Sequence, residues 1–204
     1  MKMENKKDLN VIILGDNRVG KSSILQIIKQ GESIENNNSS INKNNFIIKK
    51  KYERKKIEIL LHFKDVENQI TPQYIRDSHI VLLVFCDIKS LDYLRNSLHI
   101  YYKNNSNIFN PRFILVGNKC DTFENDKDEI MKKGQEFAEE INAQFLTCST
   151  TSLDNKDNIE RYITTEAKNY IDEEEKNKNY INNERTGSII LNQQNHTKKF
   201  KCNC

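Results

Sequence analysis

The chain has 204 residues, with 32 Lys and Arg against 29 Asp and Glu and a formal net charge of +3. This length predicts one domain with a single hydrophobic core and an extension, and the near balance of charge gives no support for nucleic-acid binding. The five cysteines form an odd set, which favours a reducing compartment over a disulfide framework. The first ten residues contain no long apolar run, so we expect neither a signal peptide nor a transmembrane span.

The hydrophobic pattern predicts strands that alternate with helices along most of the chain. The expected strands are residues 8–14, 46–52, 56–63, 80–85, 112–116 and 144–148. The expected helices are residues 21–30, 90–102, 126–141 and 158–173. A tight charged turn joins the second and third strands into a hairpin, and the fourth strand is apolar throughout, which is typical of a buried parallel strand. The alternation predicts an α/β sheet with helices on both faces.

Two segments lack this pattern. Residues 31–45 are polar and rich in Asn, so we expect a mobile surface loop there. From Glu174 onward the sequence becomes rich in Glu, Lys and Asn. We therefore expect a globular domain over residues 1–173 and a flexible tail over residues 174–204.

A phosphate-binding loop of the pattern G-x-x-x-x-G-K-[ST] follows the first strand. The residues expected to contact phosphate are Gly15, Asp16, Asn17, Arg18, Val19, Gly20, Lys21, Ser22 and Ser23. The glycines allow backbone N–H groups to surround a phosphate, and the following helix adds partial positive charge at its N-terminus. Lys21 would contact the β- and γ-phosphates, and the Ser22 hydroxyl would coordinate Mg²⁺. A chance glycine-rich turn is the alternative, which the strand before and the helix after disfavour.

A second motif, Asn118-Lys119-Cys120-Asp121, follows the strand that ends at Val116. The carboxyl edge of an α/β sheet is where such folds bind ligands. A carboxylate at Asp121 can accept two N–H bonds from guanine, whereas adenine lacks that pair of donors, so the motif favours guanine. We expect Asn118 to tie the loops together and the Lys119 stem to lie on the base plane. An ordinary polar turn after a strand is the alternative.

These motifs, in this order, resemble the Ras superfamily of small GTPases, and within it the Rab family, over residues 8–172 and the last three residues. The resemblance implies a P-loop NTPase G domain with a six-stranded sheet, five strands parallel and the strand from Phe46 antiparallel at one edge. Residues 145–150 resemble the third base-contacting loop, which implies guanine contacts at Ser149 and Thr150. The family resemblance also implies that the protein is a monomer that binds GTP or GDP together with Mg²⁺. Its expected protein partners are effectors, exchange factors and GTPase-activating proteins.

The chain departs from the family at the segments that sense the γ-phosphate. Ser40 stands where the family has a threonine that closes over Mg²⁺ and the γ-phosphate, so it keeps the hydroxyl and loses the methyl group. In the second switch, the resemblance gives Asp65 the Mg²⁺-side carboxylate and Gln69 the amide that positions water. Asn68 replaces the glycine whose N–H senses the γ-phosphate, and only nine residues separate Asp65 from Tyr74, so this switch is shortened. An ordinary surface glutamine is the alternative for Gln69.

The positions that Rab partners contact also differ. The family's three surface aromatics correspond to Phe46, Lys64 and Tyr74, so the middle ring is missing and partner specificity should differ from that of a typical member. Arg18 stands where the family commonly has a small residue. It either adds positive charge near the γ-phosphate or points to solvent, the interpretation that we favour.

The chain ends in Cys202-Asn203-Cys204, preceded by Lys198, Lys199 and Lys201. The ending resembles the Rab pattern in which prenylation enzymes attach geranylgeranyl groups to both cysteines, and two chains anchor stably where one binds marginally. Lysines near the surface of an anionic membrane would add to this attraction. Two alternatives are free thiols and a metal site that includes His196, although the latter lacks a fourth ligand nearby.

Taken together, the sequence predicts a prenylated GTP/GDP switch of the Rab type in vesicle trafficking, on the cytoplasmic face of endomembranes with a cytosolic pool. Lys21 and Gln69 would act in a slow hydrolysis of GTP. The alternative is a nucleotide-binding scaffold that recruits partners without significant hydrolysis, which the altered second switch favours. A P-loop ATPase or kinase is opposed by the motif at residues 118–121.

We expect Asp121→Asn to lower guanine-nucleotide affinity and to shift preference toward xanthine nucleotides, because the amide offers a donor where xanthine offers a carbonyl. Loss of a hydrogen bond to a charged group costs about 1.5–3 kcal/mol, so GDP affinity should fall about tenfold or more. Competition between GDP and xanthosine diphosphate measures both effects. A variant with parental GDP affinity would show that guanine is recognised elsewhere.

Overall fold

The computed structural model describes residues 5–30, 45–65, 71–104, 111–123, 126–150 and 156–197. The expectations for the 31–44 loop, Ser40, Asn68, Gln69 and the C-terminal cysteines lie outside these residues. The elements in chain order are β1 (Asn5–Gly15), α1 (Lys21–Gln30), β2 (Phe46–Tyr52), η1 (Glu53–Lys55), β3 (Ile57–Asp65), α2 (Pro72–Arg76), β4 (Ile80–Phe85), α3 (Ile88–Asn104), β5 (Arg112–Gly117), η2 (Cys120–Thr122), α4 (Lys127–Glu140), β6 (Gln144–Thr147) and α5 (Lys156–Thr197).

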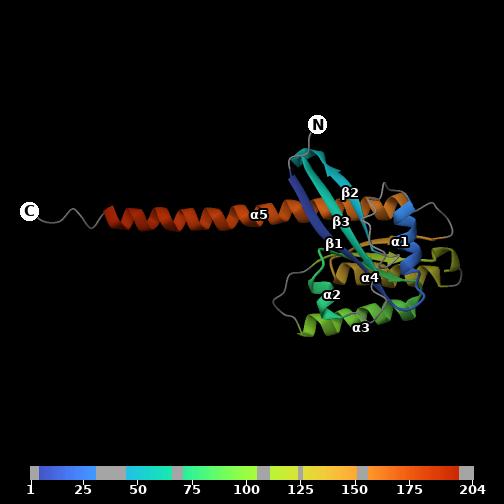
Figure 1. Ribbon diagram of the computed structural model, residues 1–204. Coiled ribbons are helices and arrows are strands. Elements are labelled where there is room, and N and C mark those ends of the chain that lie inside the picture. The colour runs from blue at the N-terminus through green and yellow to red at the C-terminus, as the bar shows by residue number, and fades with distance from the viewer. Residues whose placement is uncertain are drawn as a thin grey trace, which may run out of the picture. The chain divides into compact units, whose positions relative to one another are not determined.

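The strands form one six-stranded sheet in the order β2-β3-β1-β4-β5-β6 (Figure 1). All neighbouring pairs are parallel except β2 with β3, which are antiparallel, so β2 is the antiparallel edge strand. The predicted α/β fold with five parallel strands is therefore confirmed. The sheet lies within the first of two compact units, residues 1–167, and the second unit comprises residues 168–204.

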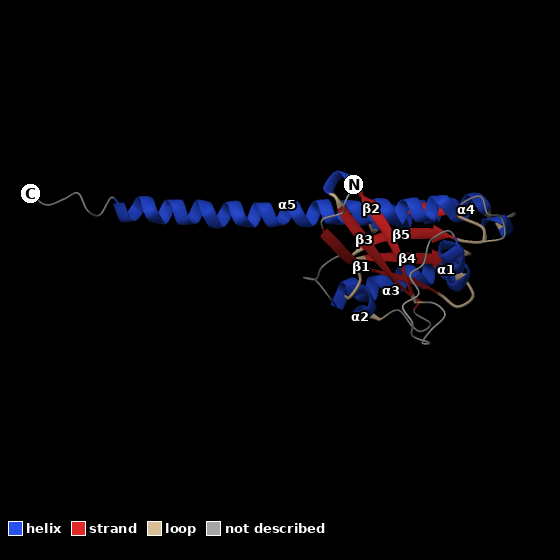
Figure 2. Ribbon diagram, turned by 45° about the horizontal axis from the view of Figure 1, so that its top comes forward, coloured by secondary structure: helices blue, strands red, loops and turns tan. Residues whose placement is uncertain are grey.

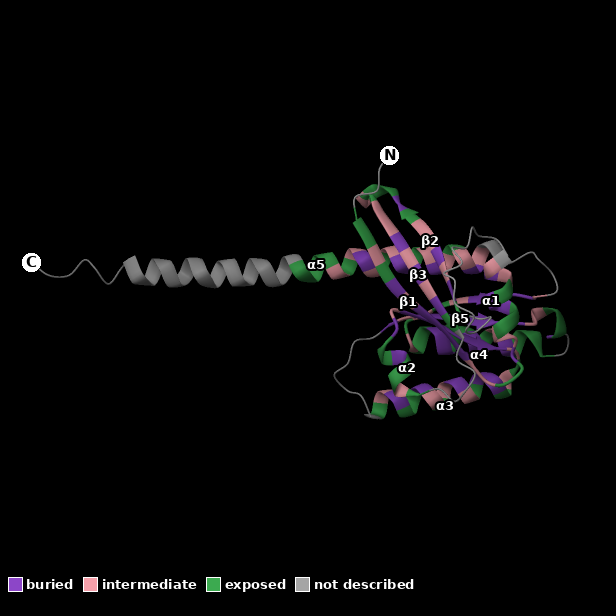
Figure 3. Ribbon diagram, in the orientation of Figure 1, coloured by how far each residue is buried: buried purple, intermediate pink, exposed green. Residues whose placement is uncertain are grey.

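One face of the sheet packs against α2, α3 and α4, which Figure 2 shows together with the sheet. β4 is buried along its whole length, because the helices that connect parallel strands cover both faces of the sheet. Figure 3 shows buried residues, in purple, in the middle of the sheet. The core on this face consists of Ile12, Leu14, Ile75, Val81, Leu83, Phe85, Leu91, Leu94, Leu98, Tyr101, Phe113, Leu115, Phe123, Ile130, Phe137 and Ala138.

The alternate strand residues point to the opposite face, since successive side chains of a strand alternate. Leu9, Val11 and Ile13 of β1 are at most 1% exposed. Two helices bury apolar side chains that do not belong to the core described above: α1 and the first turns of α5. These side chains are Ile24, Leu25, Ile28, Ile159, Ile163 and Ala167. The sheet therefore has helices on both faces, as the sequence predicts.

The structure corrects the sequence interpretation at two segments. Residues 72–76, which lie in none of the predicted strands or helices, form α2, which begins at Pro72 with Thr71 at the N-cap position. Proline suits the first helical turn because its missing N–H has no helical partner there. The tail predicted to be a disordered spacer from Glu174 is instead helical as far as Thr197.

The predicted domain boundary at residue 173 falls inside α5. Glu and Lys are good helix formers, and Lys178 pairs with Glu174 one turn earlier at 2.9 Å, which favours continuation of the helix. Within the part of the chain that the structure describes, no helix combines the length and apolar character needed to cross a membrane.

Ile75 fixes α2 to the sheet, because it is fully buried in the core although its helix has only five residues. We expect Ile75→Ala to lower the free energy of unfolding by about 2–5 kcal/mol through the cavity it leaves. Ile100→Ala is the matched control, since Ile100 is 58% exposed, and should change stability by less than about 0.5 kcal/mol. Urea unfolding measures both variants, and equal effects would contradict this role for Ile75.

Candidate functional site

The carboxyl ends of the parallel strands bring three loops to one edge of the sheet. Gly15 at the end of β1 lies in register with Val84 of β4, and Gly117 at the end of β5 lies in register with Phe85 and Thr147. The loops that start after Gly15, Gly117 and Thr147 are therefore neighbours. They carry the phosphate-loop pattern, the 118–121 motif and the 148–150 segment, which the sequence places far apart.

The two glycines of the phosphate loop are required by close approach. A Cβ at Gly15 would lie 2.3 Å from the Val84 carbonyl oxygen, and a Cβ at Gly20 would lie 2.1 Å from Asn118 Nδ2. Gly20 also has φ of 95°, in the left-handed region that side-chain-bearing residues rarely adopt. Neither position can hold a larger residue without displacing backbone or a buried amide.

Arg18 shares the left-handed backbone, with φ of 61°, and its side chain is exposed. Its carbonyl oxygen accepts a hydrogen bond from Lys119 Nζ at 2.8 Å. The interpretation that the Arg18 side chain points to solvent stays a prediction. The Lys119 side chain therefore reaches from the 118–121 motif to the phosphate loop and helps to hold that loop.

Lys21 places its ammonium group at the phosphate loop, where Nζ donates to the carbonyl oxygens of Gly15 at 3.1 Å and Asp16 at 2.9 Å. α1 begins at this residue, and the Ile24 N–H donates to the Gly20 carbonyl oxygen at 3.0 Å. Ser22 and Ser23 are exposed on the first turn of α1. A positive ammonium, exposed hydroxyls and a helix N-terminus form an edge that suits an anion.

Asn118 joins all three loops and is fully buried. Its Nδ2 donates to the Val19 carbonyl oxygen at 2.8 Å, and its backbone N–H donates to the Phe85 carbonyl oxygen at 2.7 Å. Its Oδ1 accepts a hydrogen bond from Cys148 Sγ at 3.4 Å. The amide therefore connects the phosphate loop to the base motif and to the segment after β6, the tying role that the sequence suggests.

Cys148 is the participant that sequence reasoning missed. It is 2% exposed, and burial raises the pKa of its thiol to about 12, so the sulfur keeps its proton and can donate to Asn118. Its backbone also bonds to the two ends of the segment around Asn118. The Cys148 N–H donates to the Gly117 carbonyl oxygen at 2.9 Å, and the Cys148 carbonyl oxygen accepts from the Cys120 N–H at 3.1 Å. The only signal in the sequence is its place just before Ser149.

The predicted base-contacting residues lie beside this junction. Lys119 has a left-handed backbone with φ of 59°, after which η2 carries Asp121 in an exposed position. Ser149 is 4% exposed, and Thr150 is half-buried. The exposed carboxylate can accept hydrogen bonds from a ligand at this edge. Its contact with guanine stays a prediction.

The predicted γ-phosphate segments are described only in part. Asp65 ends β3 in register with Ile13, two residues before the end of β1, so its backbone reaches the same edge of the sheet. Ser40, Asn68 and Gln69 lie outside the described residues. Of the three positions that correspond to the family's surface aromatics, Phe46 is buried and stacked on Phe63, Lys64 is exposed, and Tyr74 is 40% exposed.

A model of the family described as the Ras family matches residues 10–171. The chain belongs to the Ras family. Among curated proteins, it is 26% identical over 171 residues to septum-promoting GTP-binding protein 1 of Schizosaccharomyces pombe, covering 78% of this chain and 84% of that protein. It is 29% identical over 157 residues to Ras-related protein Rab-1C of Dictyostelium discoideum, covering 72% of this chain and 75% of that protein. The resemblance to Rab-like members of the superfamily is thereby confirmed.

Ras-family proteins generally bind GTP or GDP with Mg²⁺, and the residues of this Ras-family chain fit such a group. The glycines leave no Cβ where the loop approaches Val84 and Asn118, and Lys21 directs its ammonium to the loop carbonyls. Hydroxyl and carboxylate oxygens are the donors that Mg²⁺ prefers, and Ser22 presents an exposed hydroxyl on the first turn of α1. The expected part of Asp65 in holding Mg²⁺ stays a prediction. The chain is therefore a GTP-binding switch of the Ras and Rab-like class.

Gly20→Ala tests the junction between the phosphate loop and Asn118. The added Cβ would displace the Asn118 amide from Val19, and loss of a buried hydrogen bond costs about 1–3 kcal/mol, so we expect GDP affinity to fall about fivefold or more. Gln26→Ala is the control, because Gln26 is exposed on α1 outside the loop. Calorimetric titration of folded protein measures both, and parental affinity of Gly20→Ala would contradict the arrangement.

Proposed function

We propose that this chain is a membrane-anchored GTP/GDP switch of the Rab type that acts in vesicle trafficking and hydrolyses GTP slowly. The observation that carries the proposal is the buried Asn118 hydrogen bond, which joins a phosphate-binding loop to a guanine-selecting motif. Similarity to a Rab protein over most of the chain supports the assignment to trafficking. Effector, exchange-factor and GTPase-activating proteins are the expected partners, and the monomer is the expected form.

The described residues support binding of the nucleotide through Lys21 at the phosphates and Asp121 at the base. Ser22, Ser40 and Asp65 would hold Mg²⁺, which when bound neutralises charge on the β- and γ-phosphate oxygens. Ser149 and Thr150 would contact the base from the segment after β6. Binding of the phosphates uses the loop from Gly15 to Ser22 and does not depend on the altered second switch.

Hydrolysis depends on that switch, because Gln69 must hold a water molecule in line with the γ-phosphate. A misplacement of about 1 Å can cost about a hundredfold in rate. The chain leaves β3 at Asp65 and enters α2 at Pro72, so only residues 66–71 connect the two elements. Asn68 in place of glycine restricts the backbone course just before Gln69.

We therefore expect slow intrinsic turnover, below that of an ordinary Rab protein measured alongside. Asn68→Gly should increase the rate, and Gln69→Leu should abolish what remains, because each change acts on the placement of water. Single-turnover phosphate release from protein loaded with GTP and Mg²⁺ gives these rates. A parental rate at or above that of the reference protein would contradict this interpretation of the switch.

The competing candidate is a scaffold that binds nucleotide and recruits partners without hydrolysis, favoured by the loss of glycine at residue 68. The same measurement separates the two. A scaffold predicts no difference between the parent and Gln69→Leu, even with Asn68→Gly in both backgrounds. Retention of Lys21 at the phosphate loop favours the hydrolysing switch.

Membrane attachment is proposed through prenylation of Cys202 and Cys204 by the cell's prenylation enzymes, at endomembranes with a cytosolic pool. We expect the double variant Cys202→Ser, Cys204→Ser to move to the soluble fraction of cells, and either single variant to give an intermediate distribution, since one lipid chain binds marginally. Fractionation with immunoblotting measures this. A double variant that stays on membranes as the parent does would refute the two-lipid anchor.

A further inference from the structure

The charge of the chain is concentrated at one end of the sheet, on a surface that we call the basic hairpin tip. It comprises Lys6 of β1 and the hairpin residues Lys49, Lys51, Arg54, Lys55 and Lys56. Three acidic residues, Asp8, Glu53 and Glu58, lie among these six basic ones, because Asp8 and Lys49 are both in register with Leu60, so the tip carries a formal charge of +3. The whole chain also carries +3, so everything else sums to zero.

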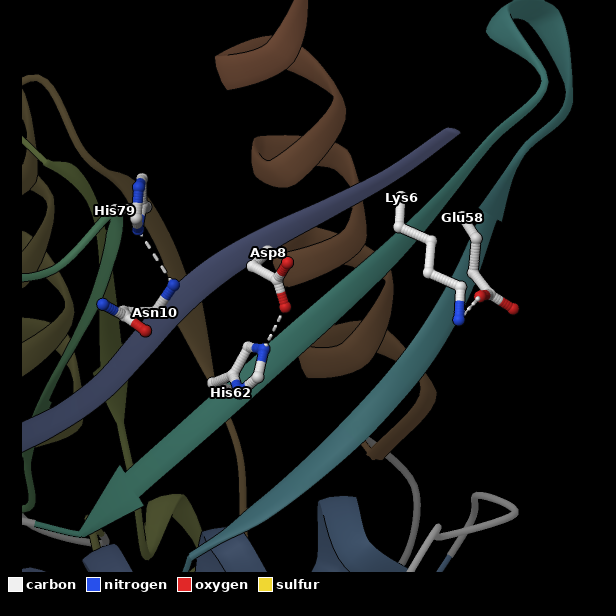
Figure 4. Close-up of polar contacts among 6 residues, drawn as sticks. All are labelled: Lys6, Asp8, Asn10, Glu58, His62 and His79. Carbon is white, nitrogen blue, oxygen red and sulfur yellow. Dashed lines mark hydrogen bonds and ion pairs between the residues drawn. The ribbon is translucent and has the colours of Figure 1, made fainter. Parts of the chain in front are cut away.

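The three consecutive lysines of the hairpin, residues 49–51, do not all lie on the same face of the sheet. Strand alternation places Lys50 on the opposite face from Lys49 and Lys51, and Lys50 forms an ion pair with Glu160 of α5. This pair fixes β2 to the first turns of α5. Lys51 is exposed on the other face, opposite Glu58 in the antiparallel register. Glu58 in turn contacts Lys6 at 3.5 Å (Figure 4). The Glu58 carboxylate is therefore flanked by two exposed lysines, Lys6 and Lys51.

The turn between the strands is ordered. η1 ends at Lys56, whose left-handed backbone with φ of 53° allows its N–H to donate to the Glu53 carbonyl oxygen at 3.1 Å. Lys55 places its ammonium group 5.8 Å from the centre of the Tyr52 ring, which is itself 7% exposed. Arg54 is exposed. The fold therefore presents these cations on a fixed scaffold.

The tip lies at the end of the sheet remote from the nucleotide edge. Asn5 of β1 is in register with Ile57 beside the turn, while Gly15 at the other end of the same strand begins the phosphate loop. Ten residues at about 3.3 Å each separate them by about 33 Å. A partner at the tip can therefore bind without covering the nucleotide loops.

We propose that the basic hairpin tip is a docking surface for the anionic lipid headgroups of a membrane. Protein interfaces are centred on buried aromatic or apolar anchors, and the aromatic ring at the described part of the tip, Tyr52, is already buried. A layer of mobile negative charge requires only complementary charge on an exposed scaffold. This inference rests on the proposed membrane attachment, and it adds a contact by the folded domain that would orient the nucleotide edge away from the lipid.

Flotation with phospholipid vesicles tests the proposal, using the full chain made without lipid modification. The test variant is Lys51→Ala with Arg54→Ala, two exposed positions outside the nucleotide site. The control is Lys89→Ala with Lys132→Ala, which removes the same charge from exposed positions in α3 and α4. The tail lysines are present in every protein, so differences between variants report the tip.

We expect the parent to bind vesicles that contain phosphatidylserine and to release them as salt is raised. Each basic side chain near an anionic surface contributes about fivefold, so the test variant should bind about twenty-five-fold more weakly, while the control stays within about twofold of the parent. Absent parental binding, equal binding by the test variant, or equal losses in both variants would overturn the proposal. Displacement from vesicles by duplex DNA at matched phosphate concentration would also overturn it, by assigning the tip to nucleic acid.

GDP affinity of the same variants separates this inference from the proposed function. Lys51 and Arg54 lie at the far end of the sheet, so both variant pairs should bind GDP as the parent does. Loss of vesicle binding with parental GDP affinity supports the tip as a separate surface. A parent that fails to bind GDP would refute the switch and leave the vesicle result to stand by itself.

Discussion

A single buried amide, the side chain of Asn118, determines how the loops at the carboxyl edge of the sheet are arranged. This amide is fully buried, and a buried polar group without a hydrogen-bond partner costs about 1–3 kcal/mol, so its position depends on the partners that it finds. Asn118 finds them in the Val19 carbonyl and the Cys148 thiol. These contacts require that the phosphate loop pass close enough to exclude a Cβ at Gly20. The glycine, the buried cysteine and the amide therefore depend on one another.

The parallel sheet supplies the frame for this junction. β4 and β5 are buried along almost their whole length and are held in register by β1 and β6, so the points at which their loops begin are fixed. The same register places the β2–β3 turn at the other end of β1. One sheet thus separates a site that binds nucleotide from a charged surface with no part in that binding. The proposed membrane contact and the nucleotide loops would therefore occupy opposite ends of the same sheet.

Much of the fold follows from the sequence, because the signals are local. The bounds of β2 and β4 match the predicted residues, and β4 is recognised by its unbroken apolar run. The phosphate loop and the 118–121 motif also identify their place, because a glycine pattern between strand and helix has few other uses. The antiparallel position of β2 came from the family resemblance, and pairing confirms it.

The remainder depends on contacts between distant residues. α2 was missed because five residues give too little periodicity, and it is held by Ile75 in a core assembled from β4 and α3. The helical course from Glu174 to Thr197 was missed because a polar segment without apolar spacing resembles a linker. The role of Cys148 depends on the fold, which brings its Sγ to 3.4 Å from Asn118 Oδ1 although the two residues are 30 positions apart in the sequence.

The central claim is that this edge of the sheet selects guanine nucleotides, and equilibrium competition tests it most directly. With Mg²⁺ present, unlabelled GTP, GDP and ATP are each titrated against a fluorescent GDP bound to the full chain. The account predicts that GTP and GDP displace the probe at similar concentrations and that ATP requires concentrations greater by orders of magnitude. Displacement by ATP as effective as that by GDP would contradict the account.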